Sequence, residues 1–155
     1  SDLYLYDRER GREIRLTSGA RAIDPALSED FAWDARTGKI ASGSVYYAKN
    51  LEDANMGIAK WDGVREVVLY RGSRFSRVGA PTPGRGSCGG RIVFSEQPPN
   101  GGERLRALEI QSGVVFDLTV PADPNEIATT PYWDEEGNLL YVAGRGGVLN
   151  AYRIE

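Results

Sequence analysis

One sequence pattern recurs along the chain at a spacing of about 50 residues. A run of alternating apolar residues that ends in a glycine turn and a Leu-Thr pair occurs twice, and its turn glycines, Gly11 and Gly113, are 102 positions apart. An aromatic and aspartate-rich hairpin pattern around Trp33 occurs again around Trp133, 100 positions later. A less regular middle copy lies between them and contains Gly63, 52 positions after Gly11. Such a period predicts an array of small, stacked structural units.

Each copy has the pattern of four short β-strands. Segments of period-2 alternation or short apolar runs are separated by Gly, Asp or Asn, and no segment keeps a helical period over 10–12 residues. In the third copy the expected strands are roughly 104–110, 114–118, 129–134 and 138–143. Four strands in each copy predict an all-β fold of β-propeller blades, each a sheet of four antiparallel strands that buries its faces against its neighbours.

The copies resemble the TolB-like (WD-repeat-like) β-propeller repeat. The residues that carry the resemblance are Leu3-Tyr4-Leu5-Tyr6-Asp7, Gly11, Leu16-Thr17 and Pro131-Tyr132-Trp133-Asp134-Glu135-Glu136-Gly137. In that family the first part forms the two outer strands of one blade, and the second part forms the two inner strands of the next. The resemblance implies a chain that begins at a third strand and ends at another third strand, with about thirteen strands in all.

We expect one propeller segment over residues 1–155, with repeats at approximately 3–56, 57–103 and 104–148 and an extra strand at 149–155. Closed propellers have at least about four blades, so three repeats are too few to close alone. Three solutions remain open: the chain is part of a longer polypeptide, two or more copies join into one ring, or the array stays open. An open array would expose an apolar blade face and bare strand edges.

The composition excludes several classes of function. Histidine is absent, so neither a Ser-His-Asp or Cys-His nucleophile system nor an imidazole-ligated metal site can be complete within this sequence. Cys88 is the single cysteine, which allows no internal disulfide and no multi-thiolate zinc site. The net charge of −3 gives no overall attraction to nucleic acid, and no stretch approaches the ~20 apolar residues of a membrane span. We therefore expect no cofactor, no metal, no catalytic residue, no nucleic-acid partner and no membrane insertion, and the compartment stays open.

Two local motifs have a functional interpretation that is weaker than the structural one. The segment 84–89 matches G-x-G-x-x-G, but it leads into an expected strand, whereas a dinucleotide site needs a helix there. The oxygen-rich stretches 123–126 and 134–138 lack the spacing of an EF-hand, and Asp134 repeats Asp34 in a turn position. We interpret 84–89 as a flexible connection, 134–138 as a turn and 123–126 as a solvated loop.

Single residues and pairs also favour structural roles. Trp33, Trp61 and Trp133 occur about once in each copy, which we interpret as blade packing rather than a ligand platform. Cys88 lies in a basic, Gly-rich stretch, where a reactive thiol is one interpretation, but a passive exposed thiol is the simpler expectation. No pair of carboxylates stands out as the acid and base of a glycosidase.

Insertions into the repeat are the best candidates for a functional site. Residues 46–55, 71–85 and 98–103 depart from the pattern, and in propellers the loops between blades and between second and third strands gather on one face. Four arginines of the second insertion are the candidate binding residues for an anionic group: Arg71, Arg74, Arg77 and Arg85. The sequence therefore predicts a non-catalytic propeller module that binds a protein or peptide partner through its loop face.

Two other functions remain open. Similar repeats form the gating propeller of prolyl-oligopeptidase-like serine peptidases, whose catalytic domain would lie outside this chain. A continuation into an α/β-hydrolase domain with a G-x-S-x-G elbow would identify that class. The third interpretation is a structural segment whose copies assemble as a homo-oligomer that completes a propeller ring, and a strict monomer at micromolar concentration would exclude it.

Overall fold

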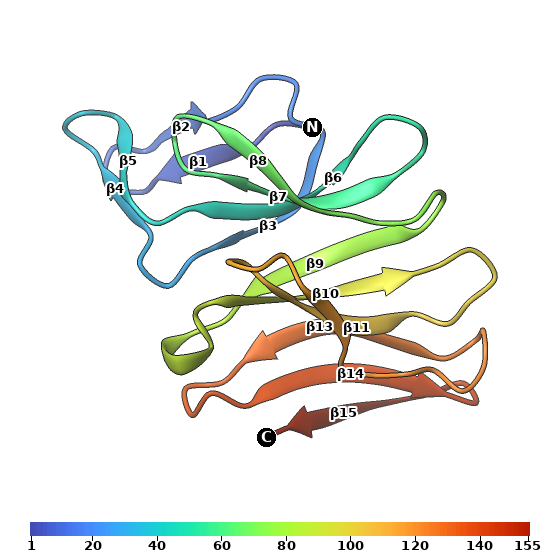
Figure 1. The fold of residues 1–155 in the computed structure, drawn as a ribbon. Coiled ribbons are helices and arrows are strands. Elements are labelled where there is room, and N and C mark those ends of the chain that lie inside the picture. Colours follow the sequence, from blue (N-terminus) through green and yellow to red (C-terminus); the bar gives the residue numbers. More distant parts are fainter.

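The computed structural model describes residues 1–155 as an all-β chain with fifteen strands, one short 3-10 helix and no α-helix. The strands form three antiparallel sheets and two separate hairpins (Figure 1). The predicted all-β class is confirmed. The structure has no helix with the length and apolar character needed to cross a membrane.

The sheets follow one another along the chain. The first sheet has the order β3 (Ala22–Leu27), β6 (Val45–Asn50), β7 (Met56–Trp61) and β8 (Glu66–Arg71). The second sheet has the order β9 (Arg77–Pro83), β10 (Arg91–Gln97), β11 (Arg104–Glu109) and β12 (Val115–Asp117). The third sheet contains β13 (Ile127–Trp133), β14 (Leu139–Arg145) and β15 (Val148–Ile154). The separate hairpins are β1 (Tyr4–Asp7) with β2 (Arg12–Arg15), and β4 (Ala32–Asp34) with β5 (Lys39–Ser42).

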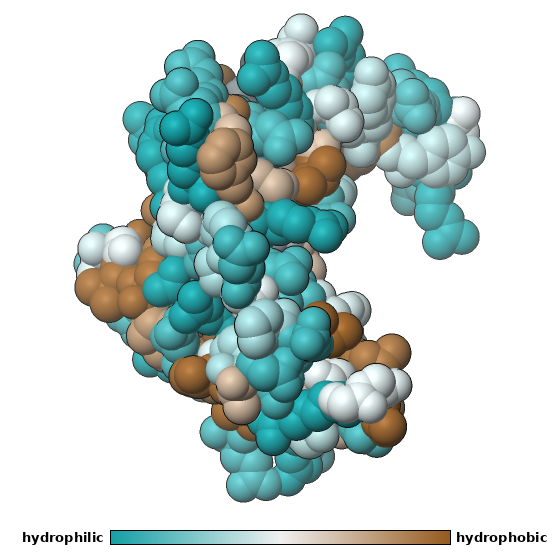
Figure 2. Space-filling model, turned by 90° about the vertical axis from the view of Figure 1, so that its right-hand side faces the viewer, coloured by the Kyte–Doolittle hydropathy of each residue, from teal (hydrophilic) through white to brown (hydrophobic).

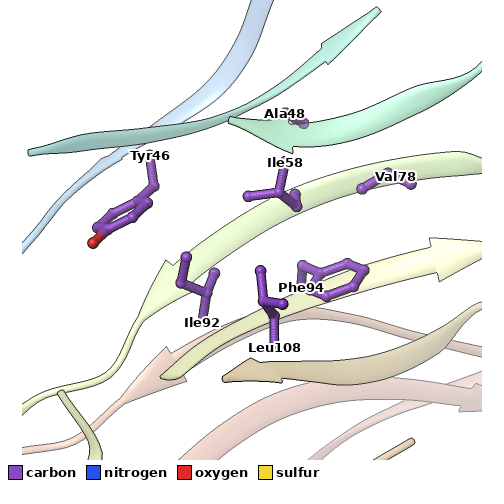
Figure 3. Packing of buried hydrophobic residues seen from close by; sticks show 7 residues of the cluster. All are labelled: Tyr46, Ala48, Ile58, Val78, Ile92, Phe94 and Leu108. Atoms are coloured by element: carbon purple, nitrogen blue, oxygen red, sulfur yellow. The ribbon is translucent and has the colours of Figure 1, made fainter. Parts of the chain in front are cut away.

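The N-terminal hairpin and the three sheets stack as successive layers from one end of the molecule to the other (Figure 1). Three apolar clusters fill the spaces between these layers. The first cluster joins the β1–β2 hairpin to the first sheet and includes Leu3, Tyr47 and Ala59. The second cluster joins the first and second sheets through Tyr46, Ala48, Ile58, Val78, Ile92, Phe94 and Leu108 (Figure 3). The third cluster joins the second and third sheets through Val93, Leu105, Ala107, Ala128, Trp133 and Leu139.

The first strand of every sheet contains the same bend. In β3, β9 and β13 the pairing register shifts at a residue with positive φ that is followed by proline. These residues are Asp24 (φ 49), Ala80 (φ 48) and Thr130 (φ 53), before Pro25, Pro81 and Pro131. Non-glycine residues rarely adopt this conformation, so its recurrence gives a reliable alignment of the three sheets. The alignment makes Leu27, Pro83 and Trp133 equivalent, because each ends its strand two residues after the proline.

This alignment corrects the predicted equivalence of the tryptophans. Trp133 ends β13 and is buried in the third cluster, whereas Trp33 lies in the added β4–β5 hairpin and Trp61 ends β7. What repeats is the local turn: Asp34 and Asp134 each accept a hydrogen bond from the amide two residues later, at 2.8 and 3.0 Å. The repeated Trp-Asp pattern of the sequence therefore marks the same type of turn, and not the same position within a sheet. The four strands predicted in the third copy do form, as β11, β12, β13 and β14.

Phe94 provides a test of the packing between the first and second sheets. Its side chain is fully buried, and its ring centroid lies 4.9 Å from that of Tyr70 in the neighbouring sheet. We expect Phe94→Ala to lower the free energy of unfolding by about 3–5 kcal/mol, because a large cavity replaces the ring. Urea denaturation measures the change, with Phe75→Ala at an exposed loop position as the control. Equal effects of the two substitutions would contradict this packing.

Candidate functional site

The connections between strands lie at two opposite ends of the stack. At one end, which we name the loop face, are the β6–β7, β8–β9 and β10–β11 loops, at the right of Figure 1. At the other end, the turn face, are the β4–β5 hairpin and the β7–β8 and β9–β10 connections, at the left of Figure 1. The strand β9 runs from Arg77 at the loop face to Pro83 at the turn face. Figure 2 looks onto the loop face and shows a largely hydrophilic surface that is hollowed on one side.

The structure brings three of the four candidate arginines together. Arg71 ends β8, Arg74 lies in the β8–β9 loop and Arg77 begins β9, and all three are exposed at the loop face. Arg85 lies at the turn face, beyond the other end of β9. The expectation that all four share one loop is therefore wrong. The reason is that the insertion contains the whole of β9, and this strand separates Arg77 from Arg85 by roughly 20 Å of extended chain.

The three loop-face arginines are free of carboxylate partners. Every ion pair of the structure involves other cationic residues. Arg74 instead places its guanidinium 4.9 Å from the centroid of the Phe75 ring, which is 61% exposed. The Phe75 amide donates to the Ala54 carbonyl at 3.0 Å and so ties this loop to the β6–β7 loop. An exposed cation and aromatic ring are thus presented on a loop of defined conformation.

Two hollows of the loop face adjoin these arginines. One, of about 370 Å³, is lined by Arg71 with Arg21, Lys49 and Glu52 among others, so its cationic side chains outnumber its carboxylates. The other hollow, of about 440 Å³, is lined by Arg77 together with Asp24, Glu103 and several uncharged polar side chains. The positive hollow next to Arg71 is the part of this face best suited to an anionic group.

A buried charged network lies between the first and second sheets. The Tyr70 hydroxyl donates to the Glu96 carboxylate, whose two oxygens lie 3.0 and 2.9 Å away, and Glu96 is only 4% exposed. Arg106 donates to Glu96 at 2.7 Å and to the Tyr70 hydroxyl at 2.9 Å, and its Nε lies 2.8 Å from Asp117. Burial, followed by the charge of Glu96, raises the pKa of Tyr70 to about 12. All the charges of the network are paired, which is the arrangement of a structural link between sheets.

The other segments that sequence analysis considered have structural roles. The segment 84–89 contains a 3-10 helix of three residues and leads into β10, which is not the strand-to-helix context of a dinucleotide site. Cys88 is partly buried against the third cluster, so the expectation of an exposed thiol is wrong. Glu126 accepts a hydrogen bond from the Ala122 amide at 2.6 Å, and no group of three or more carboxylates is placed to hold a metal ion.

Stacked antiparallel sheets, two of four strands and one of three, with equivalent bends in their first strands, define part of a β-propeller. The crystal structure of TolB from Acinetobacter baumannii is similar to 98% of this chain, with a TM-score of 0.67 and 18% sequence identity. The chain spans about a third of that structure, 34% of its length. No protein-family model matches the sequence, and no curated protein matches it. The chain therefore has a TolB-like β-propeller fold, and the predicted fold class is confirmed.

The raised pKa of Tyr70 makes a prediction about alkaline stability. The folded state favours the neutral hydroxyl, so the contribution of Tyr70 is complete below pH 10 and is lost as pH rises through about 12. Between these values the free energy of unfolding of the wild type should fall more than that of Tyr70→Phe. We expect a difference of about 1 kcal/mol, because partial solvent access screens the interaction. Urea denaturation from pH 9 to 12 measures it, and parallel curves would contradict the role of the network.

Proposed function

We propose that the chain is a non-catalytic β-propeller module of the TolB-like repeat family that binds a protein or peptide partner through its loop face. The observation that carries this proposal is the group formed by Arg71, Arg74 and Arg77, whose guanidinium groups are exposed and unpaired beside Phe75. Arginine and aromatic side chains dominate the binding energy of protein interfaces. Their concentration on one loop favours an interface over a merely solvated surface.

The chemistry of this group favours an acidic segment as the ligand. A guanidinium group binds a carboxylate through two parallel hydrogen bonds, which gives orientation as well as attraction. The hollow beside Arg71 adds Arg21 and Lys49 to the positive charge, although the Lys49 ammonium also pairs with Glu66. A peptide with several Asp or Glu residues would match both the charge and the length of this face.

The shifted pKa values support the non-catalytic part of the proposal. Side-chain and backbone hydrogen bonds lower the pKa of Asp34 and Asp134, and both carboxylates hold turns. The raised pKa of Tyr70 comes from a network without free charges. Asp34, Asp134 and Tyr70 are engaged in structure, whereas catalytic acids and bases need access to a substrate. A gating propeller of a peptidase has the same scaffold, and a parent chain with an α/β-hydrolase domain would favour that alternative.

The loop-face proposal predicts the behaviour of a triple variant, Arg71→Ala/Arg74→Ala/Arg77→Ala. We expect wild type to bind a hexaglutamate peptide with an affinity that falls as salt rises, and the triple variant to bind about tenfold or more weakly. Isothermal titration calorimetry measures both affinities. Arg85→Ala is the control, because it removes an exposed arginine from the opposite end of β9. An unchanged affinity of the triple variant, or an equal loss with Arg85→Ala, would reject this site.

A second proposal, which concerns assembly, comes from the outer face of the third sheet. Leu140 of β14 is 36% exposed, whereas the equivalent residues of the first and second sheets, Tyr46 and Val93, are 6% and 1% exposed. Leu149 and Tyr132 of the same face are 63% and 55% exposed. The whole chain exposes 9168 Å², more than the roughly 7,700 Å² of a compact monomer of 17.0 kDa. We propose that another sheet of the same kind covers this face, and that residues 1–155 alone self-associate through it.

Light scattering at rising concentration tests this assembly. We expect the mean mass of residues 1–155 to increase above that of a 17.0 kDa monomer at micromolar concentration, because apolar side chains of the third sheet find a partner. Leu149→Lys should restore the monomer by placing a charge on that face, while Val64→Lys, at an exposed turn of the first sheet, should not. A strict monomer in the wild type would contradict the proposal.

A further inference from the structure

A polar cavity of about 670 Å³ opens on the turn face, next to β6 and the β9–β10 connection. Its lining combines side chains from four segments of the chain that lie far apart in sequence. The side chains on which the inference depends are Glu29, Asp30, Ser44, Tyr46, Lys60 and Asp62. The cavity is separate from the loop-face arginines, since it lies at the opposite end of the strands.

Tyr46 presents its hydroxyl to this cavity. The residue is only 6% exposed, and its ring belongs to the second apolar cluster. Figure 3 shows the hydroxyl end of the ring directed away from the other labelled side chains of that cluster. Because Tyr46 lines the cavity while its ring is packed, the hydroxyl is the part that faces the open space. This hydroxyl has no hydrogen-bond partner within the chain.

Ser44 adds a second hydroxyl of the same kind. It precedes Tyr46 by two residues and lies immediately before β6, which begins at Val45. Ser44 is 5% exposed and lines the cavity, and its hydroxyl also lacks a partner within the chain. Both hydroxyl oxygens are accessible from the cavity, and neither is hydrogen-bonded within the chain. Two such hydroxyls in one cavity are therefore available to hydrogen-bond a polar ligand.

The charges around the cavity define the kind of ligand. Three carboxylates line it against one ammonium group, that of Lys60. The Glu29 carboxylate is held by the Gly86 amide at 2.8 Å, and burial together with the charge of Asp30 raises the pKa of Tyr46. Asp62 accepts two backbone hydrogen bonds of its turn at 2.9 Å. These carboxylates are not grouped to hold a metal ion, so an extended organic cation suits the cavity better.

We propose that this cavity binds the guanidinium group of an arginine side chain in a peptide or protein segment. Glu29 and Asp30 supply the compensating charge, and the hydroxyls of Tyr46 and Ser44 accept further hydrogen bonds. A guanidinium carries five donors in one plane and no acceptor, which matches a cavity whose free polar atoms are carboxylates and hydroxyls. Lys60 pairs with Tyr46 across β6 and β7 and also lines the cavity, so its positive charge opposes the entry of a second cation.

Calorimetric titration with the peptide acetyl-Gly-Arg-Gly-amide tests this site. We expect measurable binding of this peptide and at least about tenfold weaker binding of the analogue with citrulline, which has the same shape and no charge. Glu29→Gln/Asp30→Asn should weaken the arginine peptide by about tenfold or more. Tyr46→Phe should weaken it severalfold while the ring packing stays intact. Lys60→Met should strengthen it, because a competing cation is removed.

Control variants separate a specific site from general attraction. Glu13→Gln/Glu135→Gln makes the same change in net charge at exposed positions away from the cavity and should leave the affinity unchanged. The triple loop-face variant should also bind the arginine peptide normally, so the two proposals can fail independently. The inference is overturned if the citrulline analogue binds equally well, if the control variant loses as much affinity, or if Lys60→Met weakens binding. Absence of binding up to about 10 mM peptide would overturn it as well.

Discussion

The structure depends on the burial of both faces of its central strands. In β6, Tyr47 points to the N-terminal hairpin, whereas Tyr46 and Ala48 point to the second sheet, and none of the three is more than 6% exposed. Successive residues of a strand point to opposite faces, so a strand with several consecutive buried apolar residues needs a neighbour on each side. Stacking of sheets is therefore a condition for this sequence to fold, and the charged Tyr70–Glu96–Arg106 network within one interface is tolerated because its charges are paired.

The fold class could be predicted because the repeat is strong at the level of turns. Glycine and aspartate turn residues recur at nearly constant spacing, and they are read directly from sequence. The register within the sheets could not be obtained in the same way, because the β4–β5 hairpin inserts a second turn of identical chemistry around Asp34. A better signal was present in Pro25, Pro81 and Pro131, which follow the left-handed residue of each first strand. The prolines mark the aligned position in each first strand, although proline favours an extended conformation in the residue before it and does not by itself predict the left-handed bend.

The candidate sites were less accessible to sequence reasoning than the fold. The arginines of residues 71–85 appear as one cluster in the sequence, but the β9 strand places Arg85 at the turn face. The turn-face cavity gives no local signal at all, because Glu29, Tyr46 and Lys60 come from three different segments. Only the pairing of β6 with β7 and the stacking of the second sheet bring these side chains to one cavity. Residues that are close in sequence can be predicted to share a loop, but a site between sheets is formed by residues that are far apart in sequence.

The two ends of the stack carry different candidate binding groups, and the fold explains why they can. Packing fixes the residues of the sheet faces, so changes of charge are tolerated mainly where strands end. The loop face collects arginines that have no carboxylate partner, and the turn face collects Glu29 and Asp30 beside unpaired hydroxyls. Because these groups lie at opposite ends of the same strands, they are too far apart to neutralise one another through pairing, and the net charge of −3 conceals both. The fold can therefore present different charged groups at its two ends without any change in the sheets between them.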